Sequence, residues 1–281
     1  MLSIIERLTE SGSLTLEGLS GELRVSPATI RRDLADLEDQ QLLRRTHGGA
    51  RLIEVGHDIE IELPVQLKDG QFREAKRLIA RATARLIRPG RHVVAIGGGT
   101  TTTEVARLLS TRHDFTIVTN SLTTATQLAA RPTLRVIMTG GVMRPHSHEL
   151  VGVLAENTFQ AINIGTAVLG VDGMTAVRGA TTHDETEART NGAMVGHAQR
   201  VIVVADGSKI GRVTLASVAG IDRIDDLVTD SSADVGELEA IRAAGTRVHI
   251  ADSPSSRSRS GGDAAGYPFN PETDIVATNC F

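Results

Sequence analysis

The sequence predicts an α/β protein: a small N-terminal winged helix-turn-helix domain followed by a larger, mostly parallel α/β domain. Three observations predict this. Residues 13–39 hold two helical patterns separated by a three-residue turn. In residues 41–50, an apolar run followed by paired arginines and paired glycines indicates a β-hairpin wing. Between residues 92 and 250, short β-branched runs alternate with helix-like segments, which is typical of a parallel sheet covered by helices.

Composition narrows the class of protein. The 281 residues are enough for two domains. No apolar run approaches the roughly 18 residues of a membrane span, and no secretory signal begins the chain. We therefore expect no membrane partner and a cytoplasmic location. The single cysteine, Cys280, excludes an internal disulfide and a cysteine-based zinc site. The net charge of −4 means that any nucleic-acid-binding surface must be basic only locally.

We expect four segments along the chain. Residues 1–55 form the helix-turn-helix domain, and residues 56–74 form a linker, because this stretch holds several acids, glycines and a proline. Residues 75–252 form the larger α/β domain. Residues 253–281 are rich in Ser, Gly and Pro, so they cannot bury enough surface to offset the entropy of ordering. We expect this tail to be disordered.

The first two helices of the N-terminal domain are predicted from apolar spacing. The first is expected over residues 2–10, and the second starts after Thr15, whose hydroxyl can cap it. A turn, Arg24-Val25-Ser26, then leads into a third helix. The side chains expected to face the core of the domain are Ile4, Ile5, Leu8, Leu16, Leu19 and Leu23.

The third helix has two faces of opposite character. Ser26 can cap it, and Pro27 suits its first turn, where the amide that proline lacks would be unpaired anyway. Its apolar face carries Ile30, Leu34 and Leu37. A face of small and basic side chains can enter a DNA major groove, where arginine reaches guanine edges or phosphates. The residues predicted to contact DNA from this helix are Ser26, Ala28, Thr29, Arg31 and Arg32.

The hairpin wing would add backbone contacts. Its tip would place Arg44, Arg45 and His47 against the sugar-phosphate backbone, where contacts position a protein without reading sequence. From the helices alone, a small three-helix domain with solvated arginines remains an alternative.

Seven strands are expected in the larger domain. Ligands of parallel sheets bind beyond the carboxyl ends of the strands, so the residues that follow each strand are candidates for a binding site. The expected strands are His92–Ile96, Phe115–Thr119, Leu134–Met138, Ala167–Val171, Val201–Ala205, Asp226–Thr229 and Arg247–Ile250.

A glycine- and threonine-rich stretch follows the first of these strands. Glycines let backbone amides turn toward a ligand, a helix start adds partial positive charge, and hydroxyls donate to oxygens, so the stretch predicts a phosphate site. It is neither a nucleotide P-loop nor a dinucleotide fingerprint, and an ordinary glycine-rich turn remains an alternative. The residues predicted to bind phosphate are Gly98, Gly99, Thr100, Thr101 and Thr102.

Polar residues also follow the other strands. Lys209 is one of only three lysines in the chain. Carboxylates, an amide and an ammonium beside a phosphate site would suit a phosphorylated polyol. Turn-forming or capping roles remain alternatives for Asp172, Glu187 and Asp206. The further residues predicted to bind this ligand are Asn120, Ser121, Gly140, Gly141, Asp172, Glu187, Asp206 and Lys209.

Two kinds of chemistry lack support in the sequence. His146-Ser147-His148-Glu149 could suggest a metal site, but no second cluster supplies the remaining ligands. No G-x-S-x-G motif supports serine-histidine catalysis. We therefore predict no metal, no cofactor and no catalytic residues.

Two sets of motifs resemble one family. S-P-A-T-I-R-R-D-L followed by L-L-R-R-T-H-G-G-A resembles the N-terminal signature of the DeoR family of bacterial transcriptional regulators. The stretches G-G-G-T-T-T, T-N-S, T-G-G, L-G-V-D-G, E-A and A-D-G-S-K resemble the DeoR-type C-terminal sensor domain, which is similar in fold to ribose-5-phosphate isomerase. The resemblance implies a sugar-phosphate effector at the strand ends, bound without turnover.

The expected function follows from both lines of reasoning. We expect a DNA-binding transcriptional regulator, a repressor of carbohydrate or polyol catabolism genes, whose DNA binding is modulated by a phosphorylated sugar. A homo-oligomer, dimer or tetramer, is expected to read paired operator half-sites. The alternative is a sugar-phosphate isomerase-like enzyme with an appended helical domain. Gly97, which stands where many family members carry an aspartate, counts against this alternative.

Overall fold

The computed structural model describes residues 3–4, 7–8, 13–39, 43–46, 48–52, 62, 65–68, 72–112 and 115–252. The predicted contacts of Ile5 and His47 and the predicted tail over residues 253–281 lie outside these residues. Within them, no helix has the length and apolar character needed to cross a membrane.

The helix-turn-helix is built from α2 (Leu16–Leu23) and α3 (Pro27–Asp39), as predicted. Thr15 caps α2 by accepting a hydrogen bond from the Gly18 amide at 3.2 Å. Ser26 accepts from the Thr29 amide at 3.2 Å at the start of α3. Both caps satisfy amides that have no partner within the helix.

The wing is a small antiparallel sheet in the order β1-β3-β2. Strands β2 (Leu43–Thr46) and β3 (Gly49–Leu52) form the predicted hairpin, and β1 (Ser13–Thr15), which the sequence did not predict, pairs with β3. A Cβ atom on Gly49 would lie 1.8 Å from the Leu14 carbonyl oxygen, so this crossing requires glycine.

One apolar cluster holds the N-terminal domain together. Leu16 and Leu23 pack at its edge and are only partly buried. Because the buried side of α3 carries only apolar residues, its small and basic side is left facing solvent. The buried members of the cluster are Ile4, Leu8, Leu19, Ile30, Leu34, Leu37, Leu43 and Ala50.

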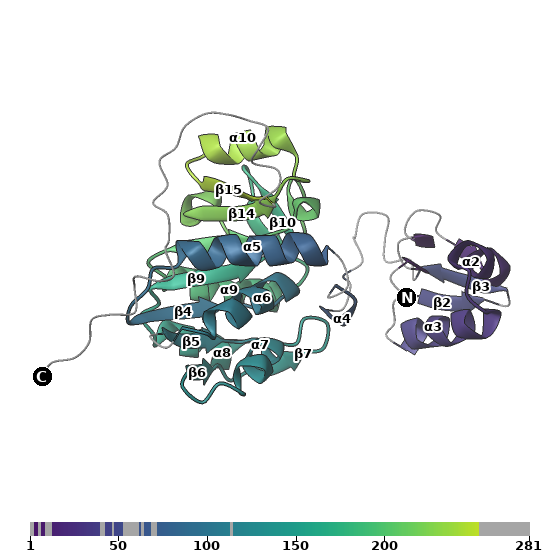
Figure 1. Ribbon diagram of the computed structural model, residues 1–281, viewed down its shortest axis with the longest axis horizontal. Helices are drawn as coiled ribbons and strands as arrows, with labels where there is room; N and C mark the ends of the chain where they lie inside the picture. Colours follow the sequence, from purple (N-terminus) through teal and green to yellow (C-terminus); the bar gives the residue numbers. More distant parts are fainter. Residues whose placement is uncertain are drawn as a thin grey trace, which may run out of the picture. The chain divides into compact units, whose positions relative to one another are not determined.

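The larger domain contains a seven-stranded sheet in which every neighbouring pair is parallel, as predicted (Figure 1). The strand order is β15-β14-β12-β9-β4-β5-β6, so the direction of chain progression reverses between β4 and β9. The strands are β4 (His92–Ile96), β5 (Phe115–Thr119), β6 (Arg135–Met138), β9 (Thr166–Gly170), β12 (Val201–Val204), β14 (Asp226–Asp230) and β15 (Arg247–Ala251).

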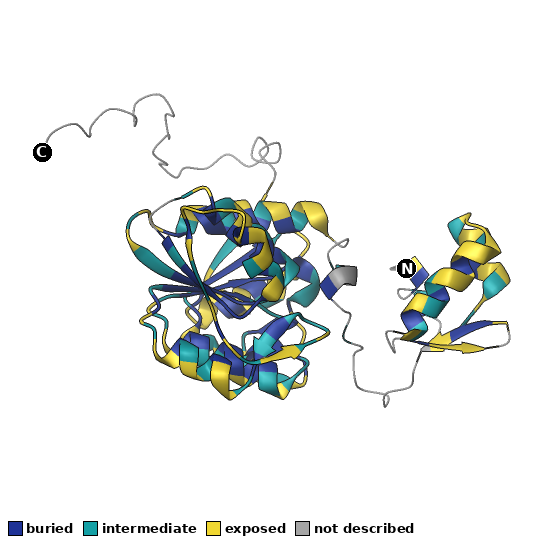
Figure 2. Cartoon of the chain, turned by 90° about the horizontal axis from the view of Figure 1, so that it is seen from below, coloured by how far each residue is buried: buried dark blue, intermediate teal, exposed yellow. Residues whose placement is uncertain are grey.

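Helices cover both faces of this sheet. Figure 2 shows buried residues along the strands and exposed ones on the outward sides of the helices. Successive side chains of β12 alternate between the faces: Ile202 packs with Ile79 and Val105, whereas Val203 packs with Phe159. One face packs against α5 (Arg73–Leu86), α6 (Thr100–Leu109) and α7 (Leu122–Leu128), the other against α8 (Val153–Gln160), α9 (Glu185–Gly196) and α10 (Val235–Ala243).

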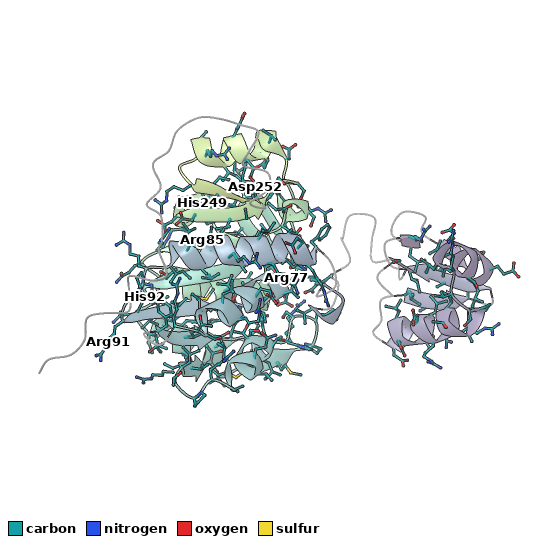
Figure 3. All side chains as sticks on the ribbon, in the orientation of Figure 1. Arg77, Arg85, Arg91, His92, His249 and Asp252 are labelled. Atoms are coloured by element: carbon teal, nitrogen blue, oxygen red, sulfur yellow. The ribbon has the colours of Figure 1, made fainter. Side chains whose placement is uncertain are left out.

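Helix α5 buries polar side chains together with apolar ones. Lys76 and Thr83 are buried on the same side as Ile79. The opposite side is basic and exposed, and Figure 3 marks Arg77 and Arg85 on it. The burial of a lysine near the start of this helix is explained by the pocket described below.

Short antiparallel strands complete the domain. The hairpin of β7 (Val142–Arg144) and β8 (Glu149–Val151) precedes α8. A second sheet, in the order β10-β11-β13, contains β10 (Gly173–Thr175), β11 (Gly179–Thr182) and β13 (Ala216–Ala219), and two 3₁₀ turns lie at Gly207–Lys209 and Ile221–Arg223.

A buried carboxylate joins the strands at one side of the large sheet. Asp226 is fully buried at the start of β14, and its Oδ2 accepts from Arg200 Nε at 2.8 Å. Arg247 Nε donates to Oδ1 at 2.9 Å, and His249 Nε2 lies 2.8 Å from the same oxygen. Burial acts to raise the pKa of Asp226, but hydrogen bonds from Arg247, Arg200 and His249 outweigh burial and hold that pKa below its usual value.

The variant Asp226→Asn should lower the free energy of unfolding by about 3 kcal/mol at neutral pH, because two guanidinium groups lose their buried partner. Since the folded-state pKa of Asp226 is depressed, its stabilisation is present above its ordinary pKa of 3.8 and is lost as pH falls below that value. Urea unfolding at several pH values measures both effects. Glu239→Gln, an exposed change on α10, is the control, and an equal loss in both variants would contradict the assignment.

Candidate functional site

The outward side of α3 presents the predicted DNA-contacting residues. The structure exposes four of them: Ala28, Thr29, Arg31 and Arg32. Neither arginine forms an ion pair with another described residue. Ser26 is exposed as well, with its hydroxyl 2.9 Å from that of Thr29. The helix therefore offers a small, polar surface with two free guanidinium groups in the same turn.

The wing arginines differ from each other. Arg44 and Arg45 are both exposed on β2. Arg45 Nε lies 2.5 Å from Glu38 Oε2, and the Arg45 amide donates to Glu38 Oε1 at 2.9 Å. These contacts hold the pKa of Glu38 below its usual value. The pair fixes the wing to the end of α3 and leaves Arg44 as the freer of the two cations.

A pocket lies at the carboxyl ends of three adjacent strands, β4, β9 and β12, where the direction of chain progression reverses. This is the position at which open parallel sheets bind ligands. Most of the residues predicted to bind the effector line this pocket. They are Gly98, Gly99, Thr100, Thr101, Thr102, Asp172, Glu187, Asp206 and Lys209.

Four residues predicted for the same site do not line the pocket: Asn120, Ser121, Gly140 and Gly141. Asn120 is fully buried and donates through Nδ2 to Asn191 Oδ1 at 3.3 Å. Ser121 caps α7. Gly140 and Gly141 follow β6, which β4 and β5 separate from β9, and Gly141 has a φ of +136°.

The glycine-rich stretch approaches a buried carboxyl that sequence reasoning did not assign to the site. The Gly98 amide donates to Glu149 Oε1, and a Cβ on residue 98 would lie 2.1 Å from that oxygen. Burial and the charge of Glu187 raise the pKa of Glu149 well above its usual value. The sequence had offered His146–Glu149 only as a metal motif, and the apolar neighbours of Glu149 were the available signal of its burial.

The start of α6 provides the predicted amides. Gly99 precedes it with a φ of +114°, a backbone conformation that favours glycine. The hydroxyls of Thr102 and Thr103 donate to the Gly99 carbonyl at 2.8 and 2.7 Å. The amides of the first helical turn are thereby held at the pocket, together with the positive end of the helix dipole.

All three lysines of the chain line the pocket: Lys68, Lys76 and Lys209. Lys68 Nζ donates to Asp172 Oδ1 at 2.8 Å, and Lys209 Nζ lies 3.8 Å from the same oxygen. Burial acts to raise the pKa of Asp172, but the two ammonium groups lower it to about 2. Burial lowers the pKa of Lys209. Sequence reasoning named only Lys209, although the scarcity of lysine pointed equally to the other two.

An arginine from the β7–β8 hairpin balances further carboxylates. Arg144 Nη1 donates to Glu62 Oε1 at 2.6 Å and lies 3.1 Å from Glu187 Oε2, while its Nε lies 3.2 Å from Asp184 Oδ2. Burial raises the pKa of Glu187. Its Oε1 lies 2.8 Å from the Thr182 hydroxyl. The sequence did not predict Arg144 or Glu62 as site residues.

The pocket thus combines two chemistries. Backbone amides and hydroxyls gather at the start of α6, and ammonium groups alternate with carboxyls beside β9 and β12. The first suits a phosphate and the second suits hydroxyl groups. Among the described residues, no three His, Cys, Asp or Glu side chains are arranged to hold a metal ion.

Comparison with known proteins identifies both domains. Residues 2–55 match the DeoR-like helix-turn-helix domain, and residues 71–231 match the DeoR C terminal sensor domain. The HTH-type transcriptional regulator GlpR of Haloferax volcanii is 38% identical over 87% of this chain and 94% of its own length. The glycerol-3-phosphate regulon repressor of Escherichia coli K12 is 31% identical over 85% of this chain and 92% of its own length.

Among solved structures, a D-ribose-5-phosphate isomerase in complex with phospho-erythronic acid aligns with 51% of this chain and 54% of its own, at 17% identity and a TM-score of 0.38. The assignment of the family depends on the sequence matches instead. Both domain matches and the near full-length relatives agree with the exposed α3 surface and the parallel α/β domain. The chain belongs to the DeoR family of DNA-binding transcriptional regulators.

Proposed function

We propose that this regulator is a repressor of carbohydrate or polyol catabolism genes, and that a phosphorylated sugar or polyol in the pocket modulates its binding to operator DNA. The single observation that carries the proposal is the convergence of the α6 amides, three lysines and buried carboxyls in one pocket. The E. coli relative is named as a repressor of the glycerol-3-phosphate regulon, and a Bacillus subtilis relative, GlcR, is named as a repressor.

The DNA-binding part of the proposal is supported by the surface of α3. Exposed Arg31 and Arg32 stand in the first half of the helix, beside small side chains that let a backbone approach base edges. A single helix of this kind makes few base contacts, so we propose a homodimer or tetramer that reads paired half-sites.

The effector part is supported by the charges of the pocket. Helix amides favour a phosphate because four of them lack partners within the helix. Asp172, Asp206 and Lys209 can then hydrogen-bond the hydroxyls of a sugar or polyol chain. Effector binding must favour one arrangement of the regulator over another, since a ligand shifts only an equilibrium to whose states it binds unequally.

Arg32→Ala should reduce the preference for operator over unrelated DNA while leaving salt-sensitive binding to both, because phosphate contacts do not depend on sequence. One lost base contact corresponds to about 1–3 kcal/mol of discrimination. Fluorescence anisotropy with both duplexes at several salt concentrations measures this loss. The control is Arg242→Ala on α10 of the other domain. Unchanged discrimination in Arg32→Ala would contradict the placement of α3 in the groove.

Thr101→Val should weaken binding of a phosphorylated sugar without unfolding the protein, because valine keeps the shape and removes the hydroxyl. A thermal-shift screen over phosphorylated sugars and polyols measures this: a ligand at a hundred times its Kd stabilises the folded form by about 2.7 kcal/mol. Thr111→Val, an exposed threonine just beyond the other end of α6, is the matched control. Equal shifts in both variants would refute the phosphate site.

The effector affinity should fall as pH rises through the raised pKa of Glu149. Below that pKa the carboxyl at the Gly98 amide is neutral, and above it a negative charge stands beside the proposed phosphate. The charge of Glu187 raises the pKa of Glu149 further, and the charge of Arg144 lowers it. Glu149→Gln keeps an acceptor for the amide and should show a flatter profile. Calorimetric titration of both proteins at matched pH cancels the titration of the phosphate itself. Identical profiles would show that Glu149 does not face the effector.

A further inference from the structure

The segment that leads from the DNA-binding domain forms part of the pocket wall. We call its described residues, Glu62 and Val65–Lys68, the connector segment; the last four form α4. The sequence predicted this stretch only as a linker. Val65 is 8% exposed, and its amide donates to the His146 carbonyl at 2.8 Å. The Lys68 carbonyl accepts from Lys76 Nζ at 2.5 Å, which holds α4 beside the start of α5 (Figure 1).

Both charged side chains of the connector segment form ion pairs with residues of the pocket. Glu62 pairs with Arg144, which also contacts Glu187. Lys68 pairs with Asp172. Glu62, Val65 and Lys68 all line the pocket. The position of the connector segment therefore depends on the same groups that would bind the effector.

Asp172 connects the connector segment to the rest of the pocket wall. Its Oδ1 accepts from Lys68 at 2.8 Å and lies 3.8 Å from Lys209, and its Oδ2 lies 3.1 Å from the Thr182 hydroxyl. An anionic ligand group such as a phosphate competes with the Asp172 carboxylate for its cationic partners, Lys68 and Lys209. Of these two, only Lys68 belongs to the connector segment.

We propose that Lys68 is an effector-binding residue that transmits occupancy of the pocket to the DNA-binding domain. An anionic group of the effector takes Lys68 from Asp172, and the connector segment then changes its position on the sensor domain. This inference rests on the proposed function. It adds that Lys68 and the connector segment couple effector binding to DNA binding. By linkage, the factor by which effector changes DNA affinity equals the factor by which DNA changes effector affinity.

A purely structural role of Lys68 would have a different consequence. In that case the Lys68–Asp172 pair would hold α4 in place whatever the pocket contains. Lys209 separates the two roles, because it reaches the same Asp172 oxygen from the turn after β12, within the sensor domain itself. Loss of Lys209 should lower the affinity for the effector. Loss of Lys68 should lower that affinity and should also remove the effect of the effector on DNA affinity.

A first experiment needs no effector. Lys68→Gln, Asp172→Asn and the double variant are compared in the full chain, with anisotropy on an operator duplex selected by the wild-type protein from random DNA. Each single variant should shift DNA affinity in the same direction by about fivefold or more, and the double variant should add little. Lys68→Arg keeps the positive charge and should bind the operator duplex with the wild-type affinity. The control Arg81→Gln, on the exposed side of α5, should also bind with the wild-type affinity. Wild-type affinity in both single variants overturns the proposal.

A second experiment tests the coupling with named probes: glycerol 3-phosphate, glucose 6-phosphate and ribose 5-phosphate. For each probe that shifts the DNA affinity of the wild type, we expect Lys209→Gln to need more probe but to reach the same ratio of affinities at saturation. Lys68→Gln should give a ratio near one. A wild-type ratio in Lys68→Gln overturns the coupling role. If no probe shifts the DNA affinity of the wild type, these three phosphates are not effectors of this protein. The first experiment then still tests whether the Lys68–Asp172 pair is coupled to DNA binding.

Discussion

The parallel arrangement of the central sheet is the constraint on which the binding site depends. Because every strand of the sheet runs in the same direction, the residues that follow β4, β9 and β12 meet at one edge although they are distant in the sequence. Gly98, Asp172 and Lys209 come from these three strand ends. From β4 the chain continues through β5 and β6 in one direction, and from β9 it continues through β12, β14 and β15 in the other. The connections that follow β4 and β9 therefore diverge, which leaves room for the pocket at that edge.

Charge compensation explains why so many ionisable groups are tolerated there. Asp172 stays ionised because two ammonium groups face it, whereas burial and the charges of neighbouring carboxylates raise the pKa of Glu149 and of Glu187. A buried charge without a partner destabilises the folded protein, and the ion pairs within this pocket avoid that destabilisation. The same ion pairs can be exchanged for contacts with a charged ligand. A ligand that brings its own phosphate alters this balance, so its binding energy depends on which internal pairs it replaces.

The sequence predicted elements whose signals are local. Apolar periodicity placed α3, short β-branched runs placed all seven parallel strands, and the caps at Thr15 and Ser26 followed from residue type. Strands of only three residues, such as β1 and β8, carry too little periodicity to be recognised. The site was predicted in part, since strand ends can be read from the chain. Arg144 could not be assigned to it, because its role arises from a hairpin that folds back onto the strand ends, and for Lys68 the scarcity of lysine was the only signal.

The same reasoning bears on how one chain couples two domains. Asn120 and Gly140 follow β5 and β6, beyond the reversal of strand order, and they do not line the pocket. The missing side of the site is supplied instead by residues that precede α5, close in sequence to the wing of the DNA-binding domain. A pocket lined only by loops that come after α5 in the sequence could bind a ligand without contact to the chain that leads to the DNA-binding domain. A pocket lined by the preceding segment brings a bound ligand into contact with the chain that leads to that domain.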